Sequence, residues 1–348
     1  MTLPPIDIEG LVHFLADLCN TPSPTGFCDE AITFVEKAFA GDENLTQTRT
    51  RKGGLVITLA GESHDSPRAL TAHVDALGAV VKEIKGNGRL KMSQVGGYAW
   101  NAVEGEGVTV FTRSGAKIRG SILISLASSH VHGGKTNDTQ RSGDNMEVRL
   151  DEKVFNADDV RKLGIEVGDF IAFDPRVELT NGFVRSRHLD DKAGVACIFG
   201  AVKAMQKAGL KPRQTTTLLI TNYEEVGHGA ACGFPQDLAE LVCVDMAAIG
   251  DGQNSDEFHS TLCLKDSGGP YHHGLSNRLR DLADSHEIDY KVDVYPYYGS
   301  DGEAFWRAGG DVAVALIGPG VDASHNYERT HTDSLLATTR WILAYLLN

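Results

Sequence analysis

The chain alternates long apolar runs with amphipathic helical patterns, and this alternation is interrupted once, from about residue 76 to residue 174. Outside that stretch, runs such as TTTLLITN carry β-branched and apolar residues without polar alternation, which is typical of strands buried on both faces. Inside it, short runs such as GVTVFT and GSILIS are separated by Gly, Asn and Ser, and long helical patterns are scarce. The pattern predicts an α/β domain formed by two sequence segments, with a small β-rich unit inserted between them.

The order of the expected helices and strands predicts the domain boundaries. The host domain should comprise residues 1–76 and 175–348 around a mixed sheet, with the inserted unit at residues 77–174. The last helix should be capped by Thr332 or Asp333, because either side chain can accept a hydrogen bond from an exposed backbone amide. In the host, helices are expected over residues 8–20, 27–40, 194–209, 276–287 and 334–347, and strands over residues 54–61, 68–75, 215–222, 238–248 and 312–318.

Composition narrows the functional classes. The 348 residues carry a formal net charge of −14, which disfavours nucleic acid and anionic membranes as partners. No apolar run approaches the roughly 18 residues that a membrane-spanning helix needs, and the first residues show no secretory signal pattern. The six cysteines are scattered without a CxxC pair, as in proteins of a reducing compartment. We therefore expect a cytoplasmic protein.

Two adjacent glutamates, Glu224 and Glu225, follow one of the apolar strands in the stretch LLITNYEEVGHG. Gly227 and Gly229 mark a turn, so the pair should lie where a strand ends and a loop begins. That edge of an open α/β sheet is where ligands bind. Taken alone, however, the pair is more simply explained as solvated surface acids.

Other strands of the host end in the same way. Apolar runs lead into AHVD, LDDK, EEVG, VDMA and a final loop with ASHN, and each of these supplies histidine or carboxylate side chains. Because the carboxyl ends of parallel strands meet at one edge of a sheet, these side chains can converge in a single crevice. The candidates are His73, Asp75, Asp190, Asp191, Glu224, Glu225, Asp245 and His325.

The chemistry of this set favours divalent metal ions. Imidazoles and carboxylates without thiolates suit zinc, cobalt or manganese. The set is larger than one structural zinc requires, and it fits two ions that share a bridging carboxylate, each with an open position for water. Of the two adjacent glutamates, one would then be a metal ligand and the other a free base within one water of it.

Each residue also has a simpler explanation. His73 alone would be interpreted as a hydrogen-bonded structural histidine, and Asp190 as the cap of the helix that follows it. Asp245 could be any turn acid, and the spacing does not decide whether His325 or His331 faces the crevice. The hypothesis depends on the conjunction, because separate strands deliver metal-binding side chains to one edge of the sheet.

The motifs AHVDALG, LDDKAG, NYEEVGHGA, VDMAA and SHNYE occur in the order found in the tetrahedral aminopeptidase or glutamyl aminopeptidase family, some members of which carry an endoglucanase label. The resemblance spans nearly the whole chain, and AHxD, LDD and EEVG in this order are highly specific. It implies a zinc-peptidase-like catalytic domain with a barrel-like inserted domain that drives dimerisation, and dimers that build hollow dodecamers. It also implies two divalent ions per subunit, zinc or cobalt, with manganese as a further candidate.

By position, the resemblance implies a ligand set. His73 and Asp245 would bind one ion, and Asp190 would bridge the two ions. Glu225 and His325 would complete the second site.

Two further acids stand beside these ligands. The resemblance implies that Asp75 holds the ring of His73 and that Glu224 is the general base. In the implied mechanism Glu224 takes a proton from a water bound between the ions, the hydroxide attacks the N-terminal peptide carbonyl, and the proton passes to the leaving amine. A metal or a nearby acid would hold the free α-amine of the peptide, so that only N-terminal residues are removed.

A second function stays open on the substrate side. The loops around KDSGGPYHHG and YYGSDGEAFW resemble those of a subgroup associated with bacterial osmolyte metabolism, and no arginine precedes His325, where many relatives have one. The alternative is a metal-dependent deacylase or amidohydrolase of small acylated or amidated dipeptides. The residues assign no substrate contacts. His228 would be a structural loop histidine or a substrate contact, and Asp301 would cap a helix or line the pocket.

Two other classes fit less well. A binding protein that has kept the ligand shell but lost catalysis is disfavoured, because the ligand candidates and the base Glu224 are all present. A glycosidase would need two opposed carboxylates without a metal requirement, which does not account for the histidines.

Overall fold

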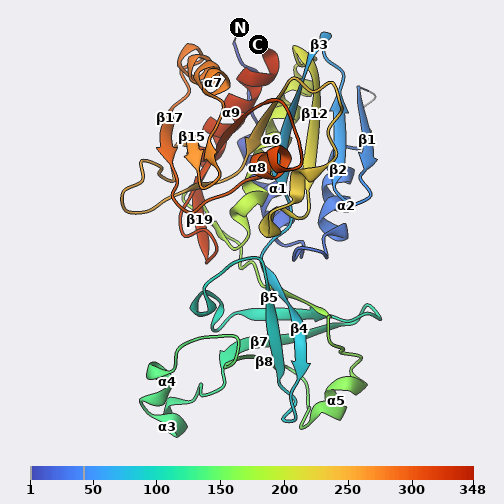
Figure 1. The fold of residues 1–348 in the computed structure, drawn as a ribbon, viewed down its shortest axis with the longest axis vertical. Helices are drawn as coiled ribbons and strands as arrows, with labels where there is room; N and C mark the ends of the chain where they lie inside the picture. Colours follow the sequence, from blue (N-terminus) through green and yellow to red (C-terminus); the bar gives the residue numbers. More distant parts are fainter. Residues whose placement is uncertain (1, 42–43) are drawn as a thin grey trace.

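The computed structural model describes residues 2–41 and 44–348, and it confirms an α/β fold with a mixed sheet and an inserted barrel (Figure 1). We term the helix-covered sheet with its attached strands the host, and the closed six-stranded sheet over residues 78–173 the barrel. The barrel hangs below the host in Figure 1, and both chain termini lie at the opposite end of the host. No described helix is long and apolar enough to cross a membrane.

The host sheet has ten strands, with a parallel centre and antiparallel neighbours. Its strands, in spatial order, are β1 (Leu45–Arg49), β2 (Leu55–Leu59), β12 (Gln214–Thr221), β3 (Ser63–His73), β13 (Glu240–Val244), β18 (Ala313–Val321), β15 (Ser260–Asp266) and β16 (Gly269–Pro270), with β14 (Ala247–Ala248) beside β18 and β17 (Tyr290–Val294) beside β15. The strands β12, β3, β13 and β18 are mutually parallel, and β2 and β15 flank them in the antiparallel sense. Parallel neighbours bring their carboxyl ends to one edge, and this edge carries the candidate site.

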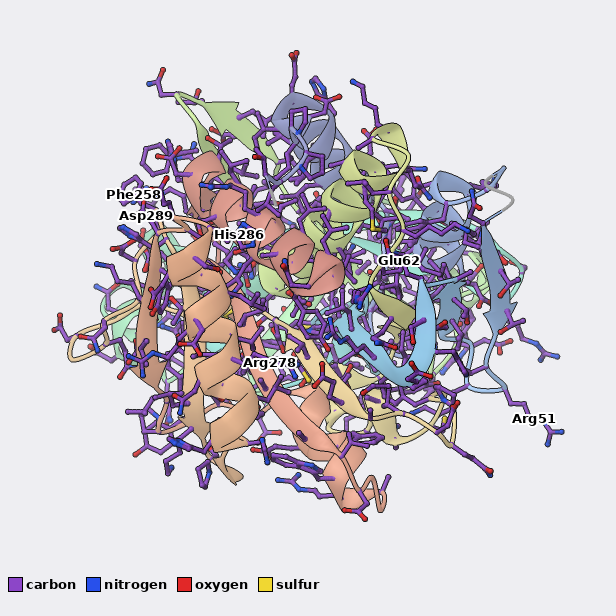
Figure 2. All side chains as sticks on the ribbon, turned by 90° about the horizontal axis from the view of Figure 1, so that it is seen from above. Arg51, Glu62, Phe258, Arg278, His286 and Asp289 are labelled. Carbon is purple, nitrogen blue, oxygen red and sulfur yellow. The ribbon has the colours of Figure 1, made fainter. Side chains whose placement is uncertain are left out.

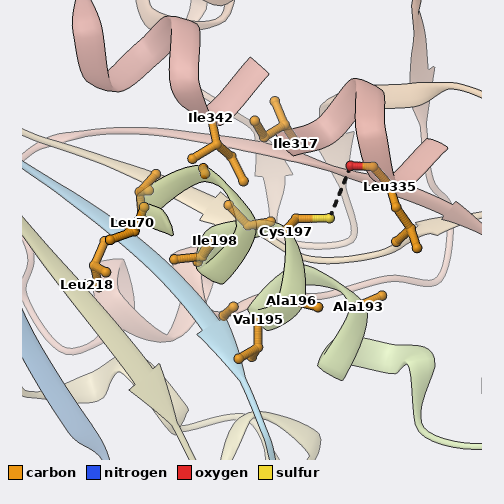
Figure 3. Packing of buried hydrophobic residues seen from close by; sticks show 14 of the residues in the cluster. Leu70, Ala193, Val195, Ala196, Cys197, Ile198, Leu218, Ile317, Leu335 and Ile342 are labelled. Carbon is orange, nitrogen blue, oxygen red and sulfur yellow. Dashed lines mark hydrogen bonds between the residues drawn. The ribbon is translucent and has the colours of Figure 1, made fainter. Parts of the chain in front are cut away.

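Helices cover both faces of this sheet, because its central strands are apolar on both sides. The host helices are α1 (Ile8–Cys19), α2 (Asp29–Ala38), α6 (Leu189–Lys207), α7 (His273–Ser285), α8 (Asp301–Arg307) and α9 (Thr332–Leu347). One face contributes Leu70, Leu218 and Ile317 to a core shared with α1, α2, α6, α7 and α9 (Figure 3). The other face contributes Leu241 and Cys243 to a smaller core with α8.

Helix α6 is buried between the sheet and the other helices. Its small residues allow close approach: a Cβ built on Gly200 would lie 2.6 Å from Cδ1 of Leu11 in α1. On another side, the Cys197 thiol points at the carbonyl oxygen of Leu335 in α9, at 3.6 Å (Figure 3). This packing fixes the N-terminal end of α6, where Asp190 lies.

The barrel has a core of its own. Its strands close in the order β4 (Gly78–Ile84), β5 (Leu90–Val95), β8 (Met146–Leu150), β7 (Lys117–Ile124), β6 (Gly107–Phe111) and β9 (Phe170–Phe173). Val81, Met92, Val110, Ile122 and Ile171 are among the residues buried inside it. Short helices lie in its connections: η1 (Trp100–Val103), α3 (Ser129–His132), α4 (Lys135–Asp138) and α5 (Ala157–Lys162).

A small antiparallel sheet joins two strands that follow the barrel in sequence to one strand that follows the last loop of the site. It consists of β10 (Glu178–Thr180), β11 (Phe183–Ser186) and β19 (Glu328–His331). In the view from the end of the host that lies opposite the barrel, the exposed side chains include Arg51, Glu62 and Arg278 (Figure 2).

The helices and strands predicted for the host are all present, with their ends shifted by a few residues. The host strands that were not predicted include β1, β15 and β17, because polar residues break up their short apolar runs. The predicted cap of the last helix was wrong. His331 is the N-cap of α9, and its Nδ1 accepts a hydrogen bond from the Asp333 amide at 3.1 Å.

Leu218 offers a test of the main core, because its side chain is fully buried in the middle of β12. Leu218→Ala leaves a cavity that the packed sheet and helices cannot fill, so the free energy of unfolding should fall by about 2–5 kcal/mol in urea titrations. Val131→Ala in α3 is the control, since that side chain is 74% exposed, and it should change the value by less than about 0.5 kcal/mol. Equal effects of the two substitutions would contradict this description of the core.

Candidate metal centre

The parallel strands deliver the predicted side chains to one edge of the sheet. His73 is the last residue of β3 and is in register with Thr221, the last residue of β12. Asp245 directly follows β13, and the two adjacent glutamates open the short helix η2 (Glu224–Val226) after β12. Ordinary strand pairing therefore brings residues distant in sequence side by side.

Two more predicted residues reach this edge from outside the parallel strands. Asp190 lies at the start of α6, where it and Asp191 have non-helical backbone angles and the peptide bond between them is cis. His325 lies in the loop between β18 and β19.

Two groups of three side chains are close enough to bind an ion each. The first is His73, Asp190 and Asp245, and the second is Asp190, Glu225 and His325; in each group, one ligand atom per residue lies within 4.8 Å of the others. Asp190 belongs to both. Its Oδ1 lies 3.3 Å from Nε2 of His73, and its Oδ2 lies 3.3 Å from Nε2 of His325. One carboxylate therefore faces both imidazoles, as a bridging ligand must.

The adjacent glutamates point to different places. Oε2 of Glu225 lies 3.5 Å from Nε2 of His325, whereas Oε2 of Glu224 lies 3.7 Å from Nε2 of His73. Glu224 belongs to neither group of three among the described residues. Its side chain is 15% exposed, against 3% for Glu225, so Glu224 is the one that can meet a bound molecule.

The electrostatics of the cluster fit divalent cations. Nε2 of His73 and Oδ1 of Asp245 are buried without a hydrogen-bond partner among the described residues, although buried polar atoms nearly always have one. Burial, together with neighbouring carboxylates, raises the pKa of Glu224 and Glu225 and raises the pKa of Asp245 to about 7. Burial opposes protonation of His73, but nearby carboxylates, Asp190 first, hold its pKa well above the ordinary value. Acids crowded in this way ionise together only beside positive charge.

Asp75 holds both the first imidazole and the glutamate turn. Its backbone carbonyl accepts a hydrogen bond from Nδ1 of His73 at 3.0 Å, and its Oδ1 lies 3.4 Å from the same nitrogen. Its carboxylate also accepts hydrogen bonds from the amides of Glu224 (3.1 Å) and Glu225 (3.2 Å) and from the Thr25 hydroxyl (2.7 Å). With Nδ1 donating, Nε2 of His73 is left free to face the other ligands.

Glu328 was missed by the sequence analysis, although it ends the SHNYE motif. It is 2% exposed, and its carboxylate spans the two parts of the second group: Oε2 accepts from the amide of Asp190 at 3.1 Å, and Oε1 accepts from the amide of His325 at 3.2 Å. The backbones of two candidate ligands are thus held at a fixed separation by a third acid.

Asp301 supports the glutamate turn from the other side. Its Oδ1 accepts a hydrogen bond from the Ala230 amide at 2.7 Å, and its Oδ2 accepts one from the Thr221 hydroxyl at 2.5 Å. The capping alternative for Asp301 is wrong, because Ser300 is the N-cap of α8 and its Oγ accepts from the Gly302 amide at 3.2 Å.

Three other candidates lie outside both groups. Asp191, not Asp190, accepts the hydrogen bond at the start of α6, from the Gly194 amide at 3.1 Å. His331 caps α9 and packs against Phe183, with ring centroids 4.8 Å apart. His228 stacks on a neighbouring tyrosine of its own loop, with centroids 5.0 Å apart.

The two loops singled out in the sequence are fastened to each other and to the site. The Ser267 amide donates to the Tyr298 carbonyl at 3.0 Å, and the Tyr298 amide donates to the Ser267 hydroxyl at 2.9 Å. The Tyr298 hydroxyl then donates to the carbonyl of Met246 at 2.7 Å, next to the candidate ligand Asp245. These contacts place the loops beside the first group of ligands.

Comparison with known proteins finds a family model and relatives that match most of the chain. Residues 53–341 match the family model described as M42 glutamyl aminopeptidase. A protein of Bacillus subtilis strain 168, named "Putative aminopeptidase YhfE", is 46% identical over 97% of this chain and 98% of its own length. The glutamyl aminopeptidase of Lactococcus lactis subsp. cremoris is 28% identical over 79% of each chain.

Solved structures show the same fold. One is the TET1 peptidase of Pyrococcus horikoshii, described as able to assemble into a tetrahedron or a large octahedral shell. It matches with a TM-score of 0.84 and 19% identity, covering 97% of this chain and 99% of that chain. The architecture, with its inserted barrel, is therefore shared although the sequences have diverged.

Glu303, in α8, gives a prediction about how the stability of the protein depends on pH. Burial, followed by the neighbouring Asp266 carboxylate, raises the pKa of Glu303 from 4.5 to about 7. The folded state then binds this proton more tightly than the unfolded state, so the contribution of Glu303 to stability falls as the pH rises from 4.5 to about 7. Glu303→Gln removes this titration. The free energy of unfolding of the variant, relative to wild type, should be higher above the window than at its lower edge, as measured by urea titrations at about pH 8 and about pH 4.5.

The control for this pH prediction is Glu166→Gln, at an exposed position in the barrel. It should change stability by the same amount at both pH values. A Glu303→Gln effect that is equally independent of pH would contradict the raised pKa.

Proposed function

The chain belongs to the M42 glutamyl aminopeptidase family and is an aminopeptidase, and from this premise we propose how it works. It removes N-terminal residues from peptides with two divalent ions per subunit, held by the two groups of side chains that share Asp190, and with Glu224 as the general base. The donor set of imidazoles and carboxylates suits zinc or cobalt, with manganese as a third candidate.

The shared Asp190 carboxylate carries this proposal. Its two oxygens face the imidazoles of His73 and His325 at equal distances of 3.3 Å. An acid that only neutralised one histidine would not need to face a second histidine. Asp245 and Glu225 then complete the ligand groups on either side.

The ions and the side chains would have different roles in the reaction. When bound, the ions would supply Lewis-acid chemistry, lowering the pKa of the attacking water and polarising the peptide carbonyl. Glu224 takes the proton of that water and delivers it to the leaving amine, a role that its place outside both ligand groups supports. Asp75 keeps the imidazole of His73 in one tautomer, and Asp301 holds the turn that carries Glu224.

A substrate with a free α-amine suits this site better than an acylated one. Beyond the ligands, Asp75 adds negative charge: burial opposes its ionisation, but the neighbouring His73 holds the pKa of its carboxyl below the ordinary value, and negative charge favours a cationic amine over a neutral amide. The relatives matched over most of the chain are also named aminopeptidases. The deacylase or amidohydrolase alternative has no comparable support.

The inserted unit at residues 77–174, which contains the barrel, is the proposed dimerisation domain. Val131, Phe155 and Val167 are 74%, 71% and 67% exposed there, and exposed large apolar side chains are typical of contact surfaces. A homo-oligomer, from a dimer upward, follows. The described cysteines are all free, which supports a reducing, cytoplasmic setting.

Glu224→Gln tests the assignment of the base. The amide keeps the shape of the side chain but cannot accept the proton, so kcat should fall by about 10²- to 10⁴-fold on a peptide with a free N-terminus. Ion content, measured by mass spectrometry after purification without chelators, should stay at two per chain, because Glu224 is not a proposed ligand.

Glu152→Gln, at an exposed position of the barrel, is the matched control and should have wild-type activity. Wild-type turnover by Glu224→Gln would show that another group moves the proton. Wild-type protein with one ion or none would contradict the two-ion centre.

A further inference from the structure

The second group of ligands is not built by the host alone, because the barrel contacts its histidine. Nδ1 of His325 donates to the carbonyl oxygen of Gly97, in the segment between β5 and η1. A ligating imidazole commonly uses its other nitrogen in this way, and the contact fixes both the tautomer and the direction of the ring. Nε2 is left facing Asp190 at 3.3 Å and Glu225 at 3.5 Å.

The two histidines differ in what holds them. His73 ends a buried strand, is 1% exposed, and has Asp75 of the host as the partner of its Nδ1. His325 lies in a loop with a side chain that is 40% exposed, and its backbone φ of +65° is in the left-handed region, which non-glycine residues rarely adopt. A residue in that conformation persists only where its surroundings hold it.

A buried arginine ties the same loop to the barrel. Arg187 is 2% exposed and donates to the carbonyl of Asn326, the neighbour of His325, at 3.0 Å. Its other terminal nitrogen donates to Oε1 of Glu106 at 2.9 Å and to the carbonyl of Ala102, both in the barrel. Because a buried ion pair is costly to break from one side, this contact resists movement of the loop away from the barrel.

Adjacent glycines in the barrel turn differ sharply in their surroundings. Gly96 has a φ of +76°, and a Cβ built on it would lie 2.5 Å from Cδ2 of Leu77 and 3.6 Å from Oε2 of Glu225. For Gly97, no described atom lies within 4 Å of such a Cβ. Alanine at Gly96 must therefore shift the Leu77 side chain and is strained at this positive φ, which disturbs the turn, whereas alanine at Gly97 has room and keeps the carbonyl in place.

We propose that the barrel positions His325 and Glu225 and thereby sets the affinity of the second ion, while the first ion site depends on the host alone. Gly97 acts through its carbonyl, and Arg187 and Glu106 act through the loop backbone, so these are positioning residues. The inference rests on the proposed two-ion centre.

Zinc titration calorimetry on the chelator-stripped, full-length protein tests this directly. Gly96→Ala should weaken the second ion by about 10- to 100-fold, the usual effect of disturbing a partner of a metal-bound histidine, and leave the first unchanged. Gly86→Ala, the same chemical change in the barrel turn between β4 and β5, should bind both ions as wild type does, because no described atom lies within 4 Å of the added Cβ. Retention of the first ion shows in each variant that the host is folded.

Glu106→Gln tests the other connection between the barrel and the loop of His325, which runs through Arg187. It removes the charge that pairs with Arg187, so the second ion should again be weakened selectively. Activity of Gly96→Ala and Glu106→Gln should be low at limiting zinc and recover with excess zinc, which a general loss of structure would not allow.

Three results would overturn the inference. If wild type binds two ions and both variants bind them equally tightly, the barrel has no positioning role and the proposed function stands. If Gly96→Ala weakens both ions alike, the effect is general rather than specific to the second site. If wild type binds a single ion or none, the two-ion centre itself fails.

Discussion

Carboxylates crowded at the carboxyl edge of a parallel sheet are the constraint on which the rest of this structure depends. Asp190 faces two imidazoles, and around it lie the buried Asp245 and the partly buried Glu224 and Glu225, all three with raised pKa values. Buried ions without compensation cost several kcal/mol each. Hydrogen bonds from neighbouring residues hold this cluster in place. The cluster itself is most simply explained as a binding site for divalent cations.

The contacts around the cluster divide into two kinds. Strand ends place His73 and Asp245, so the first group of ligands inherits the rigidity of the sheet. Loops place Glu225 and His325, and both residues donate the hydrogen bonds that hold them, to Asp75, to Glu328 and to a barrel carbonyl. The sheet therefore holds the first group of candidate ligands, whereas the position of the second group depends on how the barrel packs against the host.

Much of this could be predicted from the sequence, because buried parallel strands have a recognisable apolar pattern and end at one edge of the sheet. That rule accounts for His73, Glu225 and Asp245, whereas Asp190 and His325 join them from the start of α6 and from the loop before β19.

Other features could not be predicted. The roles of Glu328 and Asp301 depend on backbone amides far away in sequence, and the contact between Gly97 and His325 depends on the packing of two units, so no local pattern records them. The most direct test of the account is the hydrolysis of one peptide series with free and N-acetylated termini, before and after chelation and with zinc or cobalt restored. The protein should cleave the free N-termini alone, lose this activity on chelation and regain it with metal. Cleavage confined to acylated or amidated dipeptides, or cleavage that chelation leaves intact, would contradict it.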